Sequence, residues 1–152
     1  PEQAMLWCAE ENIFLAADQV LAKITPNVSV WAVDPDGDPL GLYLRSLRNL
    51  QALPEDALVL PGHQLPFRGL HARLQNLIDS HERSLDRLEK RLKEKPRRAV
   101  DLFGALFARQ IGQDLLGMAT GEAIAHLNCL ISRGRAVRIP QADGVALYGV
   151  PG

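Results

Sequence analysis

The feature that most constrains this chain is a pair of short apolar runs, each of which ends abruptly at a polar side chain. Residues 57–60 read Ala-Leu-Val-Leu, stop at a Pro-Gly turn and present His63. Residues 13–17 read Ile-Phe-Leu-Ala-Ala and stop at Asp18. Short apolar runs bounded by turn residues are typical of buried strands. The sequence therefore predicts that an imidazole and a carboxylate lie at the ends of two strands.

The rest of the pattern is a mixture of helices and strands, which predicts an α+β fold. Hydrophobic periodicity, together with Pro, Gly and N-cap signals, sets the expected bounds. The predicted elements are a β-hairpin with strands at 5–8 and 13–16, an extended stretch within 28–31, a helix from Asp38-Pro39 to just before Pro54, a strand at 57–60, a long helix over 69–95, a short helix over 100–109, a helix with Thr120 as its N-cap that ends at Arg133 before Gly134, and a second hairpin with strands at 136–140 and 145–150.

The net charge of −1 conceals an uneven distribution along the chain. Residues 1–65 carry three Lys/Arg and nine Asp/Glu, residues 66–98 carry ten and five, and residues 99–152 carry four of each. The basic middle coincides with the long predicted helix, where acid-first i,i+4 pairs and a cationic C-terminal end stabilise a helix in solvent. A solvated helix face is therefore favoured over a binding site.

The composition suits one globular domain or two small ones, because 47% of the 152 residues are hydrophobic. No apolar run approaches the ~20 residues that span a bilayer, and no signal-peptide pattern is found at the start. Cys8 and Cys129 have no metal-ligand neighbours, which favours buried thiols in a cytoplasmic protein. Because Pro1 leads directly into a strand-like run, the chain is expected to be an excised piece of a longer protein.

Three stretches resemble the metallo-β-lactamase fold hydrolases, and in particular the branch with a winged-helix domain after the hydrolase domain. They are FLAADQVL at 14–21, ITPNV at 24–28, and LPGH at 60–63 followed by Gly-Leu-His at 69–71. The resemblance covers nearly the whole chain, but it extends only to the later part of the family's hydrolase domain and the appended domain. It implies the C-terminal part of an αββα sandwich over residues 1–98 and a winged helix over residues 99–152.

The resemblance also implies roles for the two strand-end residues. In the family, a strand-end aspartate bridges two metal ions and the histidine of a later Pro-Gly-His binds one of them; these roles carry over to Asp18 and His63. The two residues are therefore expected to approach each other at one edge of the fold. The family's Gly-Asp is Ala17-Asp18 here, which leaves the carboxylate in place. Carboxylate and imidazole ligands suit zinc, and two neighbouring metal ions lower the pKa of a bridging water. Two zinc ions per intact hydrolase domain are therefore expected.

The family's main signature, His-x-His-x-Asp-His with a further histidine downstream, has no match in this sequence. His71, His81 and His126 all fall in predicted helices and cannot replace it. Because two ligands cannot complete a tetrahedral zinc site, this chain alone is expected to bind zinc weakly or not at all and to be inactive. The resemblance implies that the parent enzyme cleaves an ester, a thioester or a lactam of a small molecule by a metal-activated water.

Two further residues are candidates for substrate contact. Lys23 follows Asp18 by five residues and is placed to meet an anionic group, although a solvated lysine is favoured. His71 comes eight residues after His63, at the start of the long helix, where it could lie near the metal centre and contact the metal ligands without binding the metal itself. His81 falls in the apolar stripe of the same helix, which favours a hydrogen-bonded core histidine.

A helical pair followed by a hairpin is the pattern of a winged helix, which raises nucleic-acid binding as an alternative. The candidate recognition helix, 121–133, carries only His126 and Arg133 as cationic groups and Asn128 as a base reader. A DNA-reading helix normally combines base-edge donors with Lys/Arg for phosphates. A structural role for this domain, packing on the hydrolase domain or covering its pocket, is therefore favoured.

Three functions of different classes stay open at this stage. They are the C-terminal part of a metal-dependent hydrolase, a nuclease of the same fold that acts on RNA or DNA through the basic helix, and a non-catalytic interaction module. No membrane partner is expected. Without the first half of the sandwich, residues 5–17 would lack cover, so the chain is expected to self-associate as a two-fold dimer that buries this stretch.

Overall fold

The computed structural model of the protein describes residues 3–108 and 110–152. No helix within these residues is long and apolar enough to cross a membrane. The chain divides into two compact units, each built from two separate segments. The first unit extends to residue 27 and resumes over 44–80; the second contains 28–43 and 81–152.

These units interleave along the sequence, whereas the predicted domains are consecutive. Two long helices, α1 (Pro39–Asn49) and α2 (Leu70–Glu94), contribute residues to both units. The division describes compactness and does not test a boundary between hydrolase and winged-helix domains. The predicted boundary after residue 98 therefore stays a prediction.

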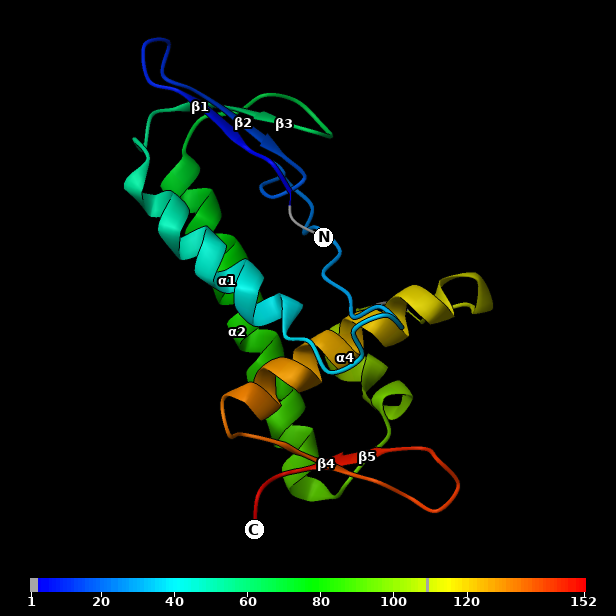
Figure 1. Cartoon of the computed structure of the whole chain (residues 1–152). Helices are drawn as coiled ribbons and strands as arrows, with labels where there is room; N and C mark the ends of the chain where they lie inside the picture. Colours follow the sequence, from blue (N-terminus) through cyan, green and yellow to red (C-terminus); the bar gives the residue numbers. More distant parts are fainter. Residues whose placement is uncertain (1–2, 109) are drawn as a thin grey trace. The chain divides into compact units, whose positions relative to one another are not determined.

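The first unit is built on a three-stranded sheet with the order β1-β2-β3 (Figure 1). β1 is Leu6–Cys8, β2 is Ile13–Ala17 and β3 is Leu58–Pro61. β1 and β2 pair antiparallel, which confirms the predicted hairpin, and β3 pairs parallel with β2. Because β2 and β3 run in the same direction, their C-terminal ends lie at the same edge of the sheet. The residues that follow both strands are thereby brought together.

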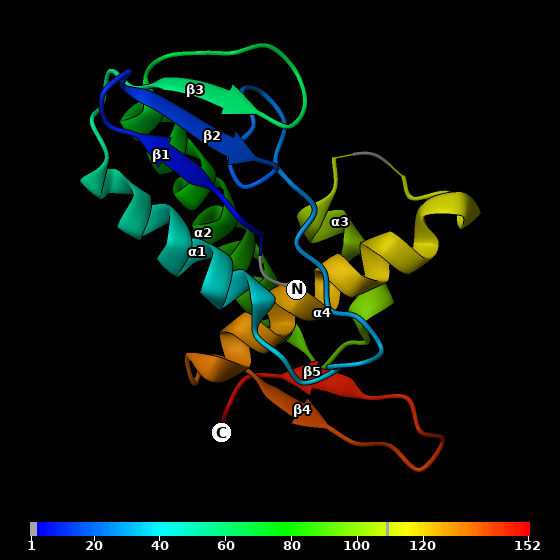
Figure 2. The ribbon, with the colours of Figure 1, turned by 45° about the horizontal axis from the view of Figure 1, so that its top comes forward.

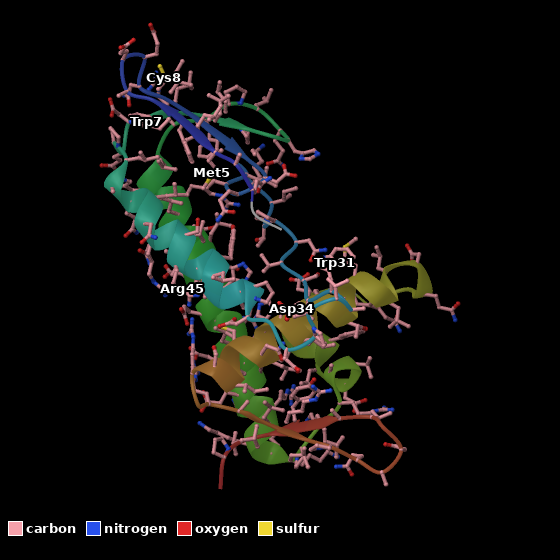
Figure 3. The ribbon with its side chains drawn as sticks, viewed as in Figure 1. Met5, Trp7, Cys8, Trp31, Asp34 and Arg45 are labelled. Atoms are coloured by element: carbon pink, nitrogen blue, oxygen red, sulfur yellow. The ribbon has the colours of Figure 1, made fainter. Side chains whose placement is uncertain are left out.

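The two faces of this sheet differ in burial, because successive side chains of a strand point to opposite faces. Phe14 and Val59 lie on the covered face and are 2% and 0% exposed. On the other face, Leu6 lies opposite Leu15, and these side chains are 63% and 41% exposed. Trp7, labelled on β1 in Figure 3, lies on the edge strand and is 36% exposed. The sheet therefore has one covered face and one open apolar face.

The helices of the first unit follow the predicted pattern closely. Asp38 caps α1, because its Oδ1 accepts a hydrogen bond from the Gly41 backbone N at 2.7 Å. A short 3₁₀ turn, η1 at Leu50–Ala52, follows α1 before the chain reaches β3. Leucines at helical spacing give α1 and α2 an apolar stripe. Those buried in the first unit are Leu44, Leu47, Leu70, Leu74 and Leu77.

The second unit is organised around α4, Leu116–Ser132, along which the irregular segment 28–38 runs (Figure 2). The Val30 backbone N donates to the Gly121 carbonyl at 3.1 Å, and Asn128 Nδ2 donates to two carbonyl groups farther along the segment. A Cβ on Gly121 would lie 2.9 Å from the Val30 carbonyl oxygen. A glycine on α4 is therefore what allows the segment to pass so close to the helix.

The extended stretch predicted within 28–31 contains neither helix nor strand, and its Val30 backbone N bonds to α4. The N-cap predicted for α4 is wrong. α4 begins at Leu116, so Thr120 is not its N-cap. The Thr120 Oγ1 donates to the Leu116 carbonyl one turn earlier at 2.7 Å, a bond that hydroxyl side chains make inside helices.

The short helix predicted over 100–109 is less regular than expected. A 3₁₀ turn, η2 at Ala99–Leu102, leads into a single α-helical turn, α3 at Phe103–Leu106. Arg109 lies outside the described residues. A second 3₁₀ turn, η3 at Gln113–Leu115, precedes α4.

The end of α4 and the C-terminal hairpin confirm the prediction. Gly134 has a φ of 68° and follows the helix as its predicted C-terminal stop. β4 (Val137–Ile139) pairs antiparallel with β5 (Leu147–Gly149). Tyr148 of β5 exchanges backbone hydrogen bonds with Arg97, at 2.8 and 2.9 Å. The hairpin is thereby attached to the chain just beyond the C-terminal end of α2.

Candidate metal-binding site

Asp18 follows β2 directly, at a point where the backbone leaves regular strand geometry. The pairing of β2 with β3 shifts register between Leu15 and Ala17, and Ala17 has a φ of 45°. This φ lies in the left-handed region, which glycine adopts without steric cost and alanine does not. The irregularity places the Asp18 side chain over the turn that follows β3, within reach of Gly62.

The turn after β3 brings His63 to the same place. The Gly62 backbone N donates to the Ala17 carbonyl at 2.7 Å, which joins the ends of the two strands. His63 Nδ1 lies 2.6 Å from Asp18 Oδ1, although the two residues are 45 positions apart. The side chains are 68% and 47% exposed. The prediction that these residues approach each other at one edge of the fold is therefore confirmed.

Gly62 is what allows this close approach. A Cβ at position 62 would lie 2.5 Å from Asp18 Oδ1 and 3.2 Å from the Ala17 carbonyl carbon. The first distance is shorter than any ordinary van der Waals contact, so a larger residue would displace the Asp18 carboxylate. The glycine of the Pro-Gly step is therefore required for the close approach of Asp18 and His63, in addition to its place in the turn.

Lys23 and His71 lie in the same unit, and each makes a hydrogen bond to a residue other than Asp18 and His63. The Lys23 backbone N donates to Gln64 Oε1 at 2.9 Å, which ties the loop after β2 to the residue after His63. No pattern in the sequence singles out Gln64 for this role. His71 Nε2 donates to the Leu53 carbonyl at 2.7 Å, so this nitrogen supports the fold near the start of α2. Contact of Lys23 or His71 with a substrate stays a prediction.

The Asp18–His63 pair has the donor chemistry of part of a metal site. A carboxylate only accepts hydrogen bonds, so His63 donates to Asp18 through Nδ1. Asp18 offers a second carboxylate oxygen in addition to Oδ1. Within residues 3–108 and 110–152, no group of three or more His, Cys, Asp or Glu side chains is placed to hold a metal ion. The residues present fit two ligands of a metal site and do not complete it.

The two histidines of the second unit are core residues. His81 and His126 are 4% and 2% exposed, and His81 Nδ1 lies 3.2 Å from His126 Nε2. The Tyr43 ring packs edge-on against His81, with ring centroids 5.6 Å apart. Burial, assisted by the neighbouring His126, lowers the pKa of His81 to about 4. The predicted hydrogen-bonded core histidine at position 81 is confirmed.

The polar groups assigned to the predicted recognition helix are engaged inside the second unit. His126 is buried, and desolvation lowers its pKa. Asn128 is 8% exposed, and its amide donates to the carbonyls of Pro35 and Gly37. Arg133 forms an ion pair with Glu82 at 2.7 Å. In the described part of the chain, these side chains therefore bond to other residues of the second unit and help to hold α4 in place there. The sequence had suggested that they would contact bases or phosphates.

Comparison with known proteins finds relatives over most of the chain. Residues 85–151 match the family model described as "Metallo-beta-lactamase-like, C-terminal domain". The chain is also 29% identical over 129 residues to the probable metallo-hydrolase YqjP of Bacillus subtilis (strain 168). That alignment covers 83% of this chain and 40% of YqjP.

Solved structures extend the similarity to nearly every residue. A beta-lactamase domain protein from Burkholderia ambifaria matches with a TM-score of 0.95 and 36% identity, over 99% of this chain and 45% of that one. A metallo-beta-lactamase family protein from Thermus thermophilus matches with a TM-score of 0.81 and 30% identity, over 97% of this chain and 44% of that one. The chain thus spans less than half the length of these relatives.

Proposed function

Because this chain belongs to the metallo-beta-lactamase-like proteins, we infer that Asp18 and His63 are two ligands of a hydrolytic metal centre. The main support for this inference is that His63 Nδ1 lies 2.6 Å from Asp18 Oδ1, and that the two residues follow neighbouring parallel strands. Parallel strand ends hold side chains on rigid backbone, which is what a metal site needs. The remaining ligands are proposed to come from polypeptide outside this chain.

The chemistry of the two residues is complementary. A bound divalent metal would lower the pKa of a coordinated water and polarise the bond to be cleaved. Asp18 supplies negative charge, and its two oxygens can contact two cations. Because Nδ1 and Nε2 point to opposite sides of the imidazole ring, His63 and Asp18 would hold the same ion only after the Nδ1–Oδ1 hydrogen bond opens. Zinc is the proposed metal, because imidazole and carboxylate donors suit it.

A small ester, thioester or lactam is the proposed substrate class of the intact enzyme, with RNA or DNA as the alternative. The support for a small molecule lies in α4. Its best base-reading side chain, Asn128, is buried and bonded to backbone, and Arg133 is paired with Glu82. If the second unit acts as a winged helix, a packing role suits these contacts better than contact with bases.

Cobalt(II) titration of the ¹⁵N-labelled chain, followed by NMR, tests the ligand assignment. The paramagnetic ion should broaden amide signals around Asp18 and His63 first. Asp18→Ala and His63→Ala should each weaken cobalt binding by at least about tenfold, since loss of an outer partner alone typically costs that much. Asp79→Ala is the matched control, because it removes a carboxylate of the same unit that bonds to Gln75, and it should leave the affinity unchanged.

Broadening centred elsewhere, or cobalt affinity unaffected by both ligand variants, would overturn the assignment. A second measurement tests the incompleteness of the site. Two ligands are fewer than the three or four that zinc normally takes from protein, so the chain should lose its zinc on dialysis. One tightly held zinc per chain after dialysis would show that further residues of this chain complete the site.

A further inference from the structure

The C-terminal half of α2 and the η2–α3 segment line two adjoining cavities in the second unit, each of about 300 Å³. Both cavities are lined by Arg91, Gly104 and Ala105, so they form one continuous groove. We call it the basic groove. Its other lining residues are Arg87, Lys90, Glu94, Arg97, Asp101 and Leu102.

The charge of the groove favours an anionic ligand. Four of its lining side chains are cationic and two are acidic. The stretch 87–98, which contains most of them, carries seven Lys/Arg and two Asp/Glu. A guanidinium presents several N–H donors in a fixed planar fork that matches phosphate oxygens. Phosphate is therefore the anion that this lining suits best.

Two of the guanidinium groups are held in place by the protein. Arg87 Nε donates to the Ala105 carbonyl at 2.7 Å, and its Nη2 donates to Ser84 Oγ at 3.0 Å. Arg97 Nη2 and Arg91 Nη1 donate to the two oxygens of Glu94 at 2.8 and 3.3 Å, and the Arg97 backbone is bridged to β5. A bound phosphate would therefore share both guanidinium groups with the Glu94 carboxylate. Ordering a long side chain costs conformational entropy when a ligand binds. Side chains that are already ordered avoid most of that cost.

The groove is open because the wall contributed by α3 has small side chains. Gly104 is exposed, and a Cβ built on it meets no atom within 4 Å. A larger side chain at position 104 would therefore extend into open space without displacing protein atoms. Because Gly104 lines both cavities, a larger side chain at this position is expected to narrow the groove while leaving the fold intact.

The surroundings of the groove favour a compact ligand over a nucleic-acid strand. The arginines that follow α4 and lie on β4 are already ion-paired: Arg133 with Glu82, Arg135 with Asp86 and Glu89, and Arg138 with Asp36. Nucleic-acid binding requires a basic track that follows successive phosphates, usually with aromatic side chains for stacking. Across α4 and β4–β5, the described residues offer no such track of unpaired cations.

We propose that the basic groove binds a compact polyphosphate, a small molecule with two or more linked phosphate groups. One phosphate would lie in the cavity lined by Arg91 and Arg97, and the next in the cavity lined by Arg87, Lys90 and Arg91. Arg91, which lines both cavities, would contact both groups. This proposal does not depend on the metal ligands, because all of its residues lie in the second unit.

Calorimetric titration of the full chain with inorganic triphosphate, at constant ionic strength, tests the proposal. Saturable binding of one triphosphate per chain is expected. Arg91→Ala should weaken it by up to about fivefold, because an ion pair of a largely exposed side chain is worth at most about 1 kcal/mol. Gly104→Leu should weaken it comparably by occupying the groove, and circular dichroism should show an unchanged helical signal.

Two matched variants serve as controls. Arg138→Ala removes an ion-paired surface arginine of the same unit, and Gly117→Leu adds a side chain where a Cβ also meets nothing within 4 Å; both should bind triphosphate normally. An equal loss in Arg138→Ala, or no loss in Gly104→Leu, would overturn the assignment to the groove. If citrate bound as tightly as triphosphate, the proposed preference of the groove for phosphate groups would be wrong. Binding of a single-stranded oligonucleotide that triphosphate cannot displace would replace the compact ligand with a nucleic acid.

Discussion

Replacement of Gly62 by alanine should separate the stability of the fold from the geometry of the proposed metal ligands, Asp18 and His63. The new Cβ would lie 2.5 Å from Asp18 Oδ1, so the carboxylate must rotate away. Rotation breaks the 2.6 Å contact with His63 Nδ1. The change adds one methyl group and removes no ligand, which makes it a sharper probe of geometry than deletion of Asp18 or His63.

The expected cost in stability is small. A hydrogen bond to a charged group contributes about 1.5–3 kcal/mol when shielded, but these side chains are 47% and 68% exposed, which reduces the contribution to about 0.5–1 kcal/mol. Alanine also restricts the unfolded chain and offsets about 0.4–1 kcal/mol, since Gly62 is not among the glycines with positive φ. The free energy of unfolding should therefore change by less than about 1 kcal/mol, whereas cobalt affinity should fall by about tenfold or more.

Urea denaturation and the cobalt titration measure the two effects on the same protein. Gly117→Ala is the matched control, because a Cβ there meets no atom within 4 Å, and it should leave cobalt affinity unchanged. Cobalt binding by Gly62→Ala as tight as that of the unmodified chain would refute the reasoning, because the carboxylate could then coordinate from a displaced position. Unfolding of Gly62→Ala would instead show that the Gly62 turn is needed for the fold itself.

Three further predictions follow from other positions. Ala17→Gly should raise the free energy of unfolding by about 0.5–1 kcal/mol, because relief of a left-handed φ, about 1–2 kcal/mol, exceeds the entropic cost of glycine; a loss of stability in urea would contradict this. His81 has a pKa of about 4 in the fold against 6.5 ordinarily, so its neutral form contributes about 3 kcal/mol of stability that is present above pH 6.5 and is lost as the pH falls towards 4. His81→Leu should flatten the pH dependence of urea midpoints over that interval, and an unchanged slope would refute the assignment. The chain should self-associate through its open sheet face, with Leu6→Lys shifting light scattering towards monomer; a monomeric unmodified chain at high concentration would contradict it.

Local patterns predicted the long elements well, because each was set by several agreeing signals. α2 was expected over 69–95 and occupies Leu70–Glu94, since a continuous leucine stripe ends at Pro96. Thr120 shows where such reasoning stops. A threonine hydroxyl can cap a helix or bond to a carbonyl one turn back, and only the preceding backbone decides between these roles. Here α4 already begins at Leu116.

The candidate site was predictable only in part. Asp18 and His63 could be found because each follows a short apolar run at a turn. The role of Gly62 could not, because a close approach between two strand ends is a property of their parallel pairing. The buried roles of His126 and Asn128 were also hidden. The sequence of α4 alone does not show that segment 28–38, which is distant in the chain, will cover one of the polar side chains of this helix.

The open apolar face and the two-ligand metal site that we propose have a common explanation. Leu6 and Leu15 are 63% and 41% exposed on the same sheet whose strand ends carry Asp18 and His63. An apolar sheet face needs a second packed layer, and a zinc site needs one or two ligands more than this pair supplies. A layer packed against this face would also reach the edge where β2 and β3 end. One further layer of polypeptide packed on this sheet could therefore bury the leucines and also supply the further ligands that the proposed metal site requires.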